Sequence, residues 1–136
     1  MKQFRTSSHS AFRLFYHLVL ITKYRRKCMN NAVLDDLEVI TRNICEKWGC
    51  ALVEFNGEAD HVHILFEAHP HMEMSKFVGN LKTVTSRLIR KAHARYLSRW
   101  YWKPVFWSGS YAVVTAGGAP LEIIKRYIES QQRPLQ

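Results

Sequence analysis

The chain has 136 residues, a length typical of one domain with a hydrophobic core of its own. Its hydrophobic fraction of 47% and aromatic fraction of 12% exclude an intrinsically disordered chain. Twenty Lys and Arg residues against eleven Asp and Glu residues give a formal net charge of +9. This excess indicates a nucleic-acid partner first and an anionic membrane surface second, with a merely basic soluble domain as the alternative.

Cysteine usage and the apolar segments limit where the chain acts. Three cysteines, Cys28, Cys45 and Cys50, lack CxxC spacing and are odd in number, which disfavours a disulfide framework or a thiolate zinc site. Residues 1–10 lack the apolar core of a signal peptide, and the apolar residues 12–21 are too few to span a bilayer. We therefore expect a cytoplasmic protein without a membrane segment.

The first third of the chain predicts an arm, a strand and a helix. Residues 1–10 are polar and are expected to form an N-terminal arm, whereas the aromatic and β-branched residues of 12–22 predict a central strand. Four cations and one tyrosine follow at 23–27, a composition that suits phosphates and a stacked base, or simply a solvated turn. A helix is then predicted from a cap at Asn30 or Asn31 to Gly49.

The next two strands carry the first candidate site. Residues 50–56 predict a strand, and the dipeptide Asn56-Gly57 predicts a hairpin to a third strand that runs to about Glu67. On that strand His61 and His63 alternate with aliphatic residues, so both imidazoles share one face. Two imidazoles on a rigid strand make half of a metal site, although a lone His-x-His pair is more often structural than catalytic.

A second long helix is predicted from a cap at Ser75, and it carries cations at helical spacing. This basic face could follow a phosphate backbone or could simply be solvated. The aromatic residues of 100–107 divide between the core and the stacking of unpaired bases. Residues 107–115 predict a fourth strand with a bulge at 108–110.

The end of the chain predicts a further helix over 120–132, since Pro120 suits a first helical turn and Gly117-Gly118 precede it. Tyr127 and Gln131 lie four residues apart and would project from the same strip of that helix. The order of elements is the split βαβ, ferredoxin-like pattern of an α+β fold. We expect one domain over 1–136, with a four-stranded antiparallel sheet, two helices on one face and the C-terminal helix that carries the tyrosine.

These residues together suggest a chemistry. A metal held by His61 and His63 needs a third ligand, and Gln131 offers an amide oxygen; magnesium or manganese would suit such a site, and zinc would also suit it by ligand type. The metal would polarise a substrate oxygen. The phenol of Tyr127 could attack phosphorus and form a covalent phosphotyrosine, which allows strands to be rejoined without ATP. The chain has no glycine-rich phosphate loop, so no nucleotide cofactor is expected.

Several ordered motifs, spread over nearly the whole chain, give it a family resemblance. They lie at residues 16–19, 22–26, 60–65, 77–82, 107–111 and 127–131. In these motifs the sequence resembles the small single-tyrosine HUH transposases of bacterial and archaeal insertion sequences, the insertion-sequence 200/605 family.

The resemblance implies a dimeric endonuclease-ligase that takes part in DNA transposition and recombination. By this resemblance His61, His63 and Gln131 hold magnesium or manganese, and Tyr127 attacks single-stranded DNA to leave a 5′-phosphotyrosine. Family members bind subterminal DNA hairpins, and their tyrosine helix can complete the partner subunit's active site. Gly117-Gly118 lie where a hinge for that exchange would be needed.

The family assignment leaves the substrate and the DNA contacts open. The chain could instead act on chromosomal palindromic repeats, or it could be a ferredoxin-like nucleic-acid-binding regulator without catalysis. The residues expected to contact DNA, from charge and placement alone, are Lys23, Tyr24, Arg25, Arg26, Lys82, Arg87, Arg90 and Lys91.

Overall fold

The computed structural model describes residues 5–7, 10–12 and 14–116. The predicted helix over 120–132, with Tyr127 and Gln131, and the Gly117-Gly118 pair lie outside the described residues. The elements in chain order are β1 (Arg5–Ser7), β2 (Ser10–Phe12), β3 (Leu14–Thr22), the 3-10 turn η1 (Lys23–Arg25), α1 (Asn31–Lys47), β4 (Ala51–Gly57), β5 (His61–Ala68), α2 (Met74–Ala92), α3 (Ala94–Leu97) and β6 (Trp107–Thr115). No helix among these is long and apolar enough to cross a membrane.

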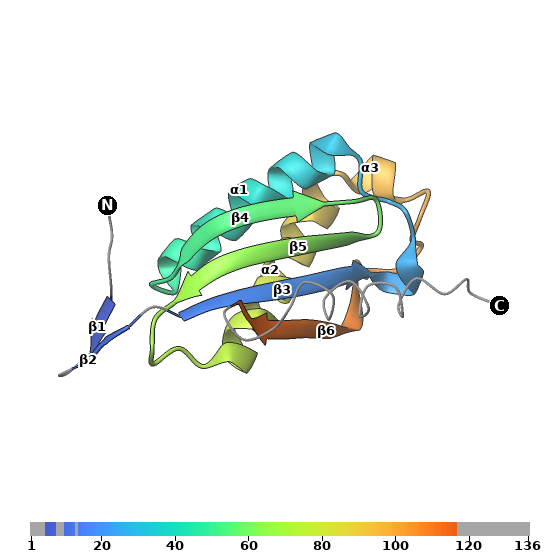
Figure 1. Cartoon of the computed structure of the whole chain (residues 1–136). Helices are drawn as coiled ribbons and strands as arrows, with labels where there is room; N and C mark the ends of the chain where they lie inside the picture. The colour runs from blue at the N-terminus through green and yellow to red at the C-terminus, as the bar shows by residue number, and fades with distance from the viewer. Residues whose placement is uncertain (1–4, 8–9, 13, 117–136) are drawn as a thin grey trace.

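Four strands form an antiparallel sheet in the order β4-β5-β3-β6. Helices α1 and α2 lie side by side against one face of this sheet, and the strands cross in front of them (Figure 1). This order and the helix placement are those of the ferredoxin-like split βαβ fold, as the sequence predicted. The two central strands, β3 and β5, are neighbours in the sheet, but α1 and β4 lie between them in the chain.

The core fills the space between the sheet and the two long helices. Alternate residues of the central strands point into it, and Phe66 is fully buried with its ring centroid 5.0 Å from that of Phe77 on α2 and 5.8 Å from that of Tyr16. The inward residues of β3 and β5 are Leu18, Leu20, Val62, Ile64 and Phe66. The intervening residues therefore point to the opposite face.

That opposite face carries the histidines. Val19 pairs with His63 and Ile21 pairs with His61 across the β3–β5 ladder, and residues directly opposite share a face. Val19 and Ile21 form a second, smaller apolar cluster with Ala112 and Val114 of β6. The imidazoles thus lie on the side of the sheet away from α1 and α2.

The helix boundaries show which predicted signals hold. The side chain of Asn30 accepts a hydrogen bond of 2.9 Å from the Val33 amide and caps α1, and Gly49 follows its end with a φ of +72°. Helix α2, by contrast, begins at Met74, before the expected cap at Ser75. The reason is that the Phe77 amide donates 3.0 Å to the backbone carbonyl of Glu73, which starts the helical ladder earlier without a side-chain cap.

Three further features differ from expectation or refine it. The first strand of the four-stranded sheet begins at Leu14 rather than at residue 12, since Ser10–Phe12, which extends past the expected arm of 1–10, pairs with Arg5–Ser7 in a separate two-stranded sheet. Helix α3 was not predicted. The bulge predicted at 108–110 is confirmed, since β6 shifts register against β3 between the pairs of Leu20 and Thr22.

A buried hydrogen bond ties β6 to α2. The indole of Trp107 donates 2.9 Å to the Thr85 hydroxyl, which in turn donates 2.6 Å to the Leu81 carbonyl. Thr85→Val should lower the free energy of unfolding by about 1–3 kcal/mol, because it leaves the buried indole N–H unpaired. Urea denaturation measures the change. The exposed Thr83 on the same helix is the matched control, and Thr83→Val should stay within about 0.5 kcal/mol.

A double substitution separates this hydrogen bond from packing. Trp107→Phe added to Thr85→Val removes the unpaired donor, so the two losses should be less than additive. Strict additivity of the two losses would contradict a coupling between these side chains.

Candidate functional site

His61 is held by a carboxylate that is itself held by an arginine. The Asp60 Oδ1 lies 2.9 Å from the His61 Nδ1. The Asp60 Oδ2 forms an ion pair with the Arg25 guanidinium, with 2.5 Å between the oxygen and the nitrogen. Asp60 is buried, with 5% of its surface exposed, so both contacts act away from bulk solvent. A carboxylate accepts hydrogen bonds, so this contact favours the proton of a neutral imidazole on Nδ1 and leaves the Nε2 lone pair for another partner.

Local backbone geometry brings Arg25 to this carboxylate. The η1 turn follows β3 directly, and Tyr24 and Arg25 adopt left-handed φ values of 59° and 53°. The amide of Thr22, just before the turn, donates 3.0 Å to the Asp60 carbonyl, and the Thr22 hydroxyl donates 2.7 Å to the Arg26 carbonyl just after the turn. The turn and the start of the histidine strand are therefore fastened together at one end of the sheet.

His63 contacts a third histidine. Its Nε2 lies 2.7 Å from the Nδ1 of His17 on β3, with ring centroids 4.8 Å apart. One of the two nitrogens must carry the proton. Burial, followed by the neighbouring His17, lowers the pKa of His63 and favours its neutral form.

The ring nitrogens of His61 and His63 could supply some of the ligands of a metal ion. A neutral imidazole is a metal ligand, and Asp60 leaves the Nε2 of His61 ready for one. The Nε2 of His63 is engaged by His17, so ligation through that atom requires His17 to release it. Among residues 5–7, 10–12 and 14–116, no group of three or more His, Cys, Asp or Glu side chains could hold a metal ion. The two histidines thus fit a site that takes further ligands from elsewhere.

Three of the expected DNA-binding cations come together around one pocket. Lys23, Lys82 and Arg90 line a pocket of about 360 Å³ between α2 and the start of β6. The Lys82 ammonium donates 2.7 Å to the Ser108 carbonyl, and burial, together with the charge of Lys23, lowers its pKa. Arg90 donates 3.1 Å to the Ser86 hydroxyl. This pocket, called the basic pocket below, therefore carries three cations on a partly apolar lining.

The other expected contacts are distributed differently. Tyr24 and Arg26 lie together, with the guanidinium 5.3 Å from the ring centroid. Arg25 is paired with Asp60, and Arg87 is exposed on α2. Lys91 lies apart from the basic pocket.

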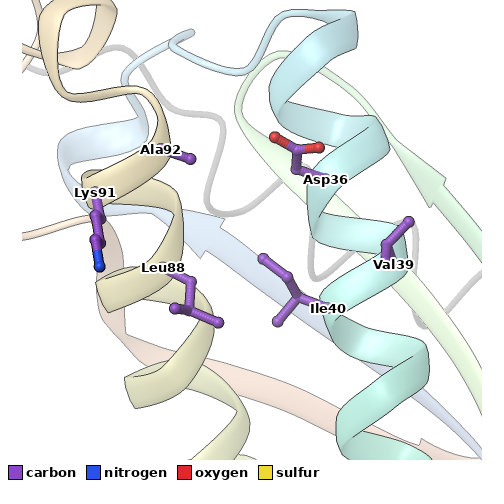
Figure 2. Close-up of a pocket in the computed structure, with 6 residues that line it drawn as sticks. All are labelled: Asp36, Val39, Ile40, Leu88, Lys91 and Ala92. Atoms are coloured by element: carbon purple, nitrogen blue, oxygen red, sulfur yellow. The ribbon is translucent and has the colours of Figure 1, made fainter.

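Lys91 instead lines a mainly apolar pocket between the helices. In Figure 2 it lies on α2 with Leu88 and Ala92, across from α1. The facing α1 residues are Asp36, Val39 and Ile40, and the space between them is about 500 Å³. None of these residues belongs to the histidine face, so this pocket is separate from the candidate metal centre.

The chain is similar to known proteins over most of its length. The family model described as "Transposase IS200 like" matches residues 10–131. The chain belongs to the IS200-like transposase family. It is therefore a DNA-processing enzyme of the transposase class.

Two curated relatives agree with this family. The ISDra2 transposase TnpA of Deinococcus radiodurans is 32% identical over 120 residues, which cover 88% of this chain and 85% of that protein. The transposase for insertion sequence element IS200 of Salmonella typhimurium is 31% identical over 127 residues, 93% of this chain and 82% of that protein.

Solved structures agree on the fold. A crystal structure of a transposase from Deinococcus radiodurans superposes with a TM-score of 0.85 at 32% identity, over 96% of this chain and 99% of that chain. A REP-associated tyrosine transposase, solved with a REP hairpin bound, superposes with a TM-score of 0.50 at 9% identity, over 95% of this chain and 69% of that chain. At that identity the second likeness concerns the fold alone.

Sequence reasoning missed two side chains that contact this transposase's histidine pair. His17 lay in a recognised motif. Its contact with His63 depends on the register between β3 and β5, which no hairpin joins, and local sequence does not determine that register. Asp60 had a usable signal, because a carboxylate next to a metal-binding histidine commonly orients its ring. Arg25 was expected at DNA, whereas the structure pairs it with Asp60.

The tautomer of His61 tests the role of Asp60 directly. In the wild type at a pH where the ring is neutral, we expect the proton on Nδ1, and Asp60→Ala should lower that population because the acceptor is gone. Long-range 15N–1H NMR of metal-free, labelled protein reads the two nitrogens. The exposed His71 is the internal control and should not change. An unprotonated Nδ1 in the neutral wild-type ring would contradict the assignment.

Proposed function

We propose that this transposase cleaves and rejoins single-stranded DNA through a covalent bond between Tyr127 and a 5′-phosphate. The observation that carries the proposal is the shared face of His61 and His63, with Asp60 fixing the first ring at the sheet end beside the basic η1 turn. The sequence spacing of Tyr127 and Gln131 supports placing a nucleophile and a third metal ligand together.

The proposed chemistry is a phosphoryl transfer in two steps. The Tyr127 oxygen loses its proton and bonds to the scissile phosphorus, while the bond from phosphorus to the 3′-oxygen breaks and that oxygen takes up a proton to become a 3′-hydroxyl. In the second step a 3′-hydroxyl attacks the phosphotyrosine and releases the phenol. No net phosphodiester energy is lost, so no nucleotide is consumed.

His61, His63 and Gln131 are the residues that would hold the metal, magnesium or manganese. When bound, the ion would polarise a phosphate oxygen and favour attack on phosphorus. The protein's own contribution is to favour the neutral form of His63 and to orient the ring of His61. Burial lowers the pKa of His63, and Asp60 directs the His61 lone pair outward.

We further propose that the substrate carries hairpins and that the enzyme acts as a dimer, with the tyrosine helix able to serve the partner subunit's site. A related fold is known with a REP hairpin bound, which supports hairpin recognition. The greater likeness to insertion-sequence transposases, 32% identity against 9%, favours a mobile element over chromosomal repeats as the DNA source.

Tyr127→Phe tests the nucleophile. With labelled single-stranded hairpin DNA and manganese, the wild type should transfer the label to protein, and the variant should not, because it lacks the phenolic oxygen. Denaturing gel electrophoresis measures the covalent product. Tyr96→Phe, on α3, is a matched control that should keep the product. Labelled protein formed by the Tyr127 variant would rule out this nucleophile, and hairpin binding without a covalent wild-type product would favour a regulator.

The metal ligands make a separable prediction. His61→Ala and His63→Ala should abolish cleavage and retain hairpin binding, because binding rests on cations and aromatic rings elsewhere. Cleavage gels and electrophoretic mobility shifts measure the two activities on the same samples. His71→Ala, exposed and beyond β5, is the control and should retain both. Parallel loss of binding and cleavage in the His61 and His63 variants would count against a metal role.

A further inference from the structure

An exposed aromatic group lies beside the basic turn, apart from the histidines. Trp102 is 90% exposed and Tyr24 is 41% exposed, the largest exposed aromatic surfaces among the described residues. Trp102 lies in the loop between α3 and β6, and Tyr24 lies in η1. Since Thr22 pairs with Trp107, both segments meet at the same end of the sheet.

Cations surround these two rings. The Lys103 ammonium lies 5.7 Å from the Trp102 ring centroid and 5.6 Å from the Tyr24 ring centroid, so one side chain joins the two aromatics. Lys23 and Arg26 lie 5.4 and 5.3 Å from the Tyr24 centroid. A hydrogen bond with Lys103 is the main cause that lowers the pKa of Tyr24, in keeping with their close contact.

The two loops that carry the rings are fastened to each other. The Arg26 guanidinium donates to the Trp100 carbonyl, and the Tyr101 hydroxyl donates 2.7 Å to the Lys23 carbonyl. The Lys23 amide donates 2.8 Å to the Phe106 carbonyl. The aromatic group is therefore mounted on a cross-linked backbone, which limits the entropy lost when a ligand stacks on it.

Two adjoining pockets continue from this group. One, of about 200 Å³, is lined by Trp102, Lys103 and Arg90, and the other is the basic pocket with Lys23 and Lys82. They share Arg90, Pro104 and Val105. No Asp or Glu is among the described residues that line either pocket, so the charged side chains that line them are all cations.

We propose that Trp102, with Lys103 and Tyr24, is a stacking site for an unpaired base of single-stranded DNA, whose neighbouring phosphates lie over Arg90 and Lys23. An exposed indole stacks any base, and the cations beside it match the phosphates on either side. Bases inside a duplex are covered on both faces by their neighbours, so the site selects unpaired nucleotides. This inference rests on the proposed action on single-stranded DNA, but it concerns binding and not cleavage.

Binding of a short oligothymidine tests the site. All variants carry Tyr127→Phe, so that a failure of the proposed cleavage chemistry does not affect the result. Trp102→Ala should raise the Kd for the single strand about 5- to 150-fold, as expected for loss of one stacked base. Trp102→Phe should recover most of the affinity, and Val39→Ala, an exposed apolar residue on α1, should change nothing.

Two further probes separate stacking from charge. A strand of abasic sugar-phosphate units and a blunt duplex of the same length should bind wild type and Trp102→Ala about equally, since the first has no bases and the second exposes only the outer faces of its two terminal base pairs. Fluorescence anisotropy measures all the affinities. Equal oligothymidine binding by wild type and Trp102→Ala would overturn the proposal and leave the ring for a protein contact. A weaker affinity of Trp102→Ala for the abasic strand would also overturn it.

Discussion

The arrangement of the site depends on the antiparallel register between β3 and β5. Pairing Ile21 with His61 and Val19 with His63 puts both imidazoles on the face away from α1 and α2, while Val62 and Ile64 enter the core. Because side chains alternate with a period of two, a slip by one residue would bury the histidines and expose the aliphatic residues. The apolar contacts that stabilise the core therefore also fix the face on which the histidines lie.

Polar contacts then orient the side chains that the strand register places on this face. Asp60 links the basic turn to the histidine strand, since it binds Arg25 with one oxygen and His61 with the other. The same turn provides Lys23 to the basic pocket and Tyr24 to the exposed aromatic group. The histidine pair, the basic pocket and the exposed aromatic group thus meet at one end of the sheet, an arrangement that would suit the proposed binding of a DNA strand near a metal.

Local sequence signals predicted much of this fold. Alternation placed His61 and His63 on one face, and the Asn30 cap and the bulge at 108–110 lie as expected. The predicted hairpin between β4 and β5 is also present, but Asn56 and Gly57 pair within β4 and the turn lies at 58–60. Long-range contacts did not follow from sequence. His17 meets His63 across strands joined by a helix and another strand, and Arg25 turns toward Asp60 through left-handed backbone that no local pattern indicates. Helical spacing and the family resemblance both indicated Tyr127 and Gln131, and the motif over 127–131 that contains them lies outside the described residues.

Direct detection of nitrogen ligands on a bound ion tests the central claim that this register builds half of a metal site. Pulsed electron paramagnetic resonance on the full chain with one equivalent of Mn2+ reads imidazole nitrogens through their hyperfine coupling. The wild type should show coupling to two histidine nitrogens, and His61→Ala and His63→Ala should each retain one. Bound Mn2+ without any histidine coupling in the wild type would contradict the account.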